Sequence, residues 1–168
     1  LVKAGSGMLT LGVPTSPGVP PELAAHTVTL SYNDAAQVRA AFAEIGPDVA
    51  CVIVEPVAGN MNCIPPVPGF LEALREQCTQ HGAVLIFDEV KTGFRVAPGG
   101  AGELFGVKAD LTTFAKALGN GFPIAAVGGR DEVMDTIAMA QVVQGGTYCG
   151  HALGCAAAMG VLDAIEQD

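Results

Sequence analysis

Two continuous apolar runs stand out along the chain. They occupy residues 49–54 and 83–87, and each is followed by an acidic residue, Glu55 and Asp88. Uninterrupted apolar runs of this length are typical of strands buried on both faces of a parallel sheet. Two shorter strand candidates follow at residues 111–114 and 124–128.

Helical patterns fill the intervals between these strands. Asn33 and Asp34 are suitable caps for a helix that ends at Ile45 before Gly46-Pro47, and Pro68 opens a second helix with Phe70, Leu71, Leu74 and Cys78 facing inward. Residues 131–139 and 149–166 are further helical candidates. The alternation predicts an α/β domain with a mostly parallel sheet and flanking helices, incomplete at both ends.

Residues 1–22 break this alternation because they are rich in glycine and proline. Such a segment cannot be a regular helix or a central strand. Long loops in compact domains are often functional, so this segment is either a functional loop or a frayed end. No internal repeat and no linker divides the remaining sequence, which predicts one domain.

Charge and cysteine content exclude several classes of protein. The formal net charge is −9 and only 15% of the residues are charged, without a cluster of Lys and Arg, so nucleic acid is not an expected partner. No apolar run reaches the roughly 20 residues of a membrane-spanning helix. The five cysteines form no C-x-x-C pair and the three histidines are scattered, which predicts free thiols in the cytoplasm and no metal site.

Three charged residues follow predicted strands and are the candidates for chemistry: Glu55, Asp88 and Lys116. Ligands of parallel α/β sheets bind beyond the carboxyl ends of the strands. A carboxylate that stabilises a protonated pyridine and a lysine that forms an imine are the two protein groups that a pyridoxal phosphate site requires. A structural Asp–Lys ion pair explains the same pattern equally well.

Gly145-Gly146-Thr147 is a candidate anion site, since backbone amides and a hydroxyl before a helix bind phosphate. Taken alone, the run is explained better by a turn and an N-cap.

Three longer stretches favour the cofactor site over these simpler explanations. They are residues 53–59 (IVEPVAG), 87–95 (FDEVKTGFR) and 114–123 (FAKALGNGFP), and in this order they resemble the class III aminotransferase family. Within that family the sequence is most similar to the glutamate-1-semialdehyde 2,1-aminomutases, a likeness that extends over residues 2–12, 16–20, 32–34 and 55–63.

The resemblance implies a fold type I enzyme, of which residues 1–168 are part of the large, cofactor-binding domain. It implies that Lys116 holds pyridoxal 5'-phosphate as a Schiff base and that Asp88 meets the pyridine nitrogen. Thr147, with Gly146, would reach the cofactor phosphate of the neighbouring subunit in a homodimer with shared active sites. Glu55 would lie near the substrate, as would Ser6 in a loop over the active site formed by residues 1–22.

The reaction implied is amino-group transfer within a small amino-acid-like substrate, from glutamate-1-semialdehyde to 5-aminolevulinate, a tetrapyrrole precursor. A class III transaminase with another amino donor and a catalytically inactive module of the same fold are the alternatives. Lys91 departs from the family pattern, which usually has Gln or Met there, so its role is open. Residues 146–152 (GTYCGHA) also depart from the aminomutase pattern, which leaves the substrate in question more than the cofactor.

Overall fold

The computed structural model describes residue 22 and residues 25–167 of the chain. Two compact units are distinguished, one ending at Ile86 and the other beginning at Phe87. The boundary lies inside strand β2, Val84–Asp88, and not in a linker. The sequence, which predicts one domain without a linker, does not reveal this division.

The first unit contains helix α2, Ala35–Ile45. The Asp34 side chain caps it by accepting a hydrogen bond from the Gln37 amide at 2.8 Å, as the sequence predicts. Val38 and Phe42 form its buried face, and the chain then continues through a 3-10 turn, Gly46–Asp48. The turn needs Gly46, because a Cβ there would overlap the His81 ring.

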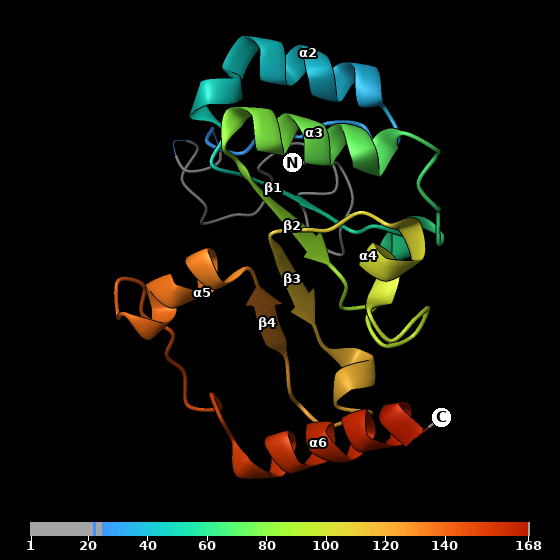
Figure 1. Ribbon diagram of the computed structural model, residues 1–168, viewed down its shortest axis with the longest axis vertical. Coiled ribbons are helices and arrows are strands. Elements are labelled where there is room, and N and C mark those ends of the chain that lie inside the picture. The colour runs from blue at the N-terminus through green and yellow to red at the C-terminus, as the bar shows by residue number, and fades with distance from the viewer. Residues whose placement is uncertain (1–21, 23–24, 168) are drawn as a thin grey trace. The chain divides into compact units, whose positions relative to one another are not determined.

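Strand β1, Cys51–Val54, and helix α3, Phe70–His81, complete the core of this unit. Helices α2 and α3 pack side by side (Figure 1). The helix α3 begins two residues after the predicted Pro68, because Gly69 adopts a left-handed conformation, with φ of 87°, in the turn before it. The buried side chains of α3 include all four predicted ones, Phe70, Leu71, Leu74 and Cys78.

The second unit contains strands β3, Leu111–Phe114, and β4, Ala126–Gly129, paired antiparallel with Leu111 opposite Gly129. Helices α5, Asp131–Ala138, and α6, Ala152–Gln167, follow. Sequence reasoning missed the short helix α4, Gly100–Phe105, since its glycines indicated only a turn. Within the described residues, no helix is both long and apolar enough to cross a membrane.

The strand order is β1-β2-β3-β4, with β2 running from the first unit into the second. The sheet is mostly parallel and the helices flank it, which confirms the predicted α/β class; the β3–β4 pair is its antiparallel part.

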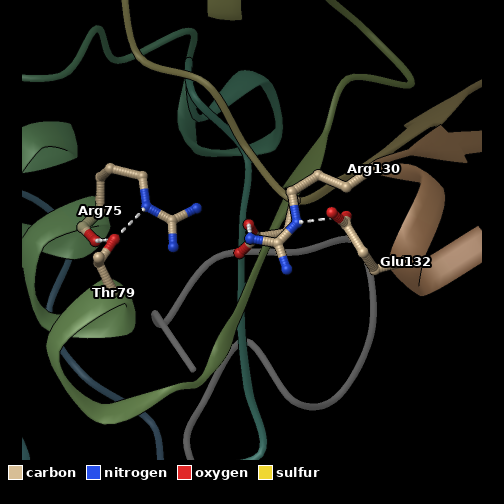
Figure 2. A network of polar contacts seen from close by, with 5 residues as sticks. Arg75, Thr79, Arg130 and Glu132 are labelled. Carbon is tan, nitrogen blue, oxygen red and sulfur yellow. Dashed lines mark hydrogen bonds and ion pairs between the residues drawn. The ribbon is translucent and has the colours of Figure 1, made fainter.

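Polar contacts fix local structure in each of the two units (Figure 2). In α3, the Arg75 Nε donates to the Thr79 hydroxyl at 3.0 Å. In the second unit, Arg130 makes an ion pair with exposed Glu132 at 3.7 Å and a shorter one, at 3.0 Å, with the buried carboxylate of Asp110. The Asp110 contact is the more important of the two, because a buried charge requires a partner.

Candidate functional site

Asp88 and Lys116 lie at the same edge of the sheet in the second unit. Asp88 is the last residue of β2, and Lys116 follows the end of β3 by two residues. The Glu89 amide donates to the Thr113 carbonyl at 3.1 Å, and this bond aligns the ends of the two neighbouring strands. Asp88 and Lys116 therefore lie at the ends of adjacent strands.

The backbone at Lys116 makes a sharp turn. Ala115 is extended, but Lys116 has φ of 45°, a left-handed conformation that is uncommon for a residue other than glycine. Its carbonyl accepts hydrogen bonds from the amides of Gly119 at 3.1 Å and Asn120 at 2.9 Å, which hold the 3-10 turn Lys116–Leu118. The lysine side chain is exposed at the start of this turn.

Asp88 is half-buried, and its Oδ1 accepts a hydrogen bond from the Val90 amide at 3.1 Å. In the part of the chain that the structure describes, Asp88 forms no ion pair with Lys116, and its Oδ2 has no hydrogen-bond partner. The alternative of a structural Asp–Lys ion pair is therefore not what the structure contains. One carboxylate oxygen remains able to accept a hydrogen bond from a ligand.

Lys91 lies in the turn directly after β2. The turn is closed by a hydrogen bond from the Gly93 amide to the Glu89 carbonyl at 2.8 Å. The Lys91 side chain is half-buried and, among the described residues, takes part in no ion pair. It is a second amine in the same unit as Lys116.

Gly145-Gly146-Thr147 is exposed and does not directly precede a helix. The Cys149 amide donates to the Gly146 carbonyl at 3.0 Å and closes a turn, and α6 begins only at Ala152, three residues later than the sequence predicts. The local structure is therefore a turn. No hydrogen bond connects Thr147 with Asp88 or Lys116 in the described structure.

Glu55 belongs to the first unit, at the end of β1. Its Oε2 accepts a hydrogen bond from the Gly59 amide at 3.0 Å, and the neighbouring Pro56 carbonyl accepts one from the Tyr32 hydroxyl at 2.7 Å. Burial is the main reason that the pKa of Tyr32 is raised to about 12, and the charge of Glu55 adds to it. Ser6 lies outside the described residues, as does almost all of the predicted loop 1–22.

Comparison with known proteins decides the family. The family model described as aminotransferase class-III matches residues 3–168. The chain belongs to the class III aminotransferases.

Solved structures agree with this family. A transaminase with pyridoxal phosphate bound is 32% identical with a TM-score of 0.84, over 89% of this chain and 36% of that one. A β-phenylalanine aminotransferase from Variovorax paradoxus is 43% identical with a TM-score of 0.74, over 78% of this chain and 31% of that one. An omega-transaminase from Sphaerobacter thermophilus is 31% identical with a TM-score of 0.85, over 90% of this chain and 35% of that one. The chain thus spans about a third of the length of these structures.

Class III aminotransferases use pyridoxal phosphate, and the residues of this chain fit that cofactor. Asp88 offers an unpartnered carboxylate oxygen of the kind that a protonated ring nitrogen needs, and the exposed amine of Lys116 lies at the same sheet edge.

Glu89 is the polar residue that sequence reasoning missed. Its carboxylate is buried, with 2% of the residue exposed, and accepts hydrogen bonds from the Thr92 hydroxyl and the amides of Ala101 and Gly102. The available signal was an acidic residue in an otherwise apolar stretch, followed by the glycine-rich residues 99–102. A buried charge needs partners, but the pattern does not identify the amides of Ala101 and Gly102 as those partners.

Proposed function

We propose that this chain is the cofactor-bearing part of a pyridoxal-phosphate-dependent enzyme that transfers amino groups. Lys116 holds the cofactor covalently and Asp88 binds its protonated ring nitrogen. The observation that carries the proposal is the alignment of these two residues at adjacent strand ends in a class III aminotransferase. When bound, the cofactor supplies an electron sink for the bonds of the substrate's α-carbon.

Several residues of this chain have roles in the proposal. The Lys116 amine, once freed by the incoming substrate, moves the α-proton as a general base. Asp88 keeps the ring nitrogen protonated by offering a negative charge. Thr147 and Gly146 bind phosphate across a homodimer interface, and Glu55 and Ser6 lie near the substrate. These last roles rest on the family resemblance.

The finer proposal is a glutamate-1-semialdehyde 2,1-aminomutase of the cytoplasm, which supplies 5-aminolevulinate for tetrapyrrole synthesis. The stretches at residues 2–12 and 55–63 support it. A transaminase acting between two different molecules is the second candidate, and the 43% identity to a β-phenylalanine aminotransferase favours it.

Covalent labelling tests the cofactor assignment. The purified chain is mixed with pyridoxal phosphate, reduced with borohydride and digested, and the modified lysine is located by mass spectrometry. We expect the label on Lys116, its loss in Lys116→Arg and its retention in the matched control Lys91→Arg. A label mainly on Lys91 would reverse the assignment, and a folded chain without specific label favours an inactive module.

Substrate feeding of the full-length protein separates the two reactions. The aminomutase converts glutamate-1-semialdehyde without any second substrate. Amino transfer from a separate donor to a separate keto acid, without that conversion, would establish the transaminase instead.

A further inference from the structure

Glu89 uses every polar group that it has. Its amide donates to the Thr113 carbonyl, and its carbonyl accepts from the Gly93 amide at 2.8 Å. Its carboxylate accepts from the Thr92 hydroxyl at 2.9 Å, the Ala101 amide at 2.6 Å and the Gly102 amide at 2.9 Å. One residue therefore ties the end of β2 to β3, to the following turn and to the start of α4.

The three bonds to the carboxylate are strong because the acceptor is charged and buried. The backbone is shaped to make them: Gly100 has φ of 69°, and a Cβ on it would overlap Glu89 Oε2. Gly100 thus approaches the carboxylate more closely than a residue with a side chain could.

Asp88 ends strand β2 and Glu89 is the next residue, so the positions of the two are coupled through the backbone. The Glu89 carboxylate accepts three hydrogen bonds, whereas the Asp88 carboxylate accepts one, from the Val90 amide. Loosening the contacts of Glu89 is therefore expected to shift Asp88, its neighbour at the end of β2.

We propose that Glu89 is the positioning residue for Asp88: by clamping residues 92–102 to the end of β2, it fixes the carboxylate that faces the cofactor. The part that concerns the cofactor rests on the proposed function; the part that concerns Asp88 does not. The Val90 amide, which bonds to Asp88, reports the position of Asp88 without any cofactor present.

Glu89→Gln tests the proposal in the whole chain. The side chain keeps its size, but the glutamine NH₂ group is a donor and cannot accept a hydrogen bond from the groups that the Glu89 carboxylate binds. Glu103→Gln is the matched control, since Glu103 accepts the Gly99 amide at 2.6 Å in the same segment but is exposed. The first readout is hydrogen–deuterium exchange without cofactor, and the second is the binding of pyridoxal phosphate, followed by its visible absorbance.

In Glu89→Gln we expect the Ala101, Gly102 and Val90 amides to exchange at least about tenfold faster, the factor that corresponds to one lost hydrogen bond to a charged group. We expect cofactor binding to weaken on the order of tenfold, because the supporting contacts set the position of Asp88. Glu103→Gln should leave Val90 exchange and cofactor binding unchanged.

If exchange became faster at Ala101 and Gly102 but not at the Val90 amide, Glu89 would stabilise only residues 92–102, and the proposal would be wrong. If Glu89→Gln does not fold, Thr92→Val removes one of the three bonds without changing the charge, and its Val90 exchange decides in the same way. If the unaltered chain binds no cofactor, the proposed function fails, but the Val90 result still confirms or refutes the positioning role.

Discussion

Because the phenol of Tyr32 is partly buried in the first unit, the stability of the folded chain depends on pH. The pKa of its phenol is raised from 10.0 to about 12, chiefly by burial, then by the charge of Glu55, while a backbone hydrogen bond with Ala58 opposes the rise. Between these two values the folded chain keeps a proton that the unfolded chain has lost. The contribution of Tyr32 to the free energy of unfolding is therefore expected to be constant below pH 10 and to fall as the pH rises toward 12.

Tyr32→Phe should lower the free energy of unfolding at neutral pH by about 1 kcal/mol, because the Pro56 carbonyl loses its hydrogen bond. It should also flatten the decline between about pH 10 and 12. Urea unfolding at several pH values measures both effects. Tyr148→Phe is the control, since Tyr148 is exposed; an equal flattening there would refute the assignment to Tyr32.

At the scale of elements, the sequence predicts those that local signals specify. Asp34 caps α2, Gly82 ends α3 in a left-handed conformation with φ of 72°, and the apolar run before Asp88 is β2. Helix α4 could not be predicted in this way. Its glycines are explained by a contact with Glu89, distant in the sequence, and local propensity carries no information about that contact.

The cap of α2 allows a test of local structure. Asp34→Ala removes the acceptor of the Gln37 amide and should lower the free energy of unfolding by about 1 kcal/mol. Glu44→Ala, at an exposed position in the last turn of the same helix, should change it by less than about 0.5 kcal/mol. Equal effects in chemical denaturation would mean that helix propensity, and not the cap, determines the stability of α2.

Strand β4 contains two adjacent glycines with different surroundings. A Cβ on Gly129 would overlap the Asp110 carbonyl and Leu111, whereas one on Gly128 would meet open space. We expect Gly129→Ala to destabilise the chain by about 1–3 kcal/mol through overpacking. Gly128→Ala should be nearly neutral in the same thermal unfolding experiment, and a reversed order would contradict the β3–β4 register.

At the scale of the whole molecule, sequence reasoning finds the residues of the candidate site more readily than its geometry. Asp88 and Lys116 are marked by apolar runs and by their family context. The left-handed turn at Lys116 and the support from Glu89 depend on hydrogen bonds between segments, such as that from Glu89 to Thr113, and no pattern of residue types encodes them. The assignments of Asp88, Lys116, Thr147, Glu55 and Ser6 as site residues remain predictions.

The proposed function also predicts which parts of the chain the cofactor stabilises. Asp88 and Lys116 both belong to the second unit, so a cofactor held by them stabilises that unit directly. At about 100 times its dissociation constant, pyridoxal phosphate should add about 2.7 kcal/mol to the free energy of unfolding of the structure that binds it. Hydrogen–deuterium exchange should then slow around residues 88–90 and 113–120 in the unaltered chain, and much less in Lys116→Arg. Protection confined to the residues before Ile86 would place the cofactor elsewhere, and equal protection in Lys116→Arg would show that covalent attachment at this lysine contributes nothing to binding.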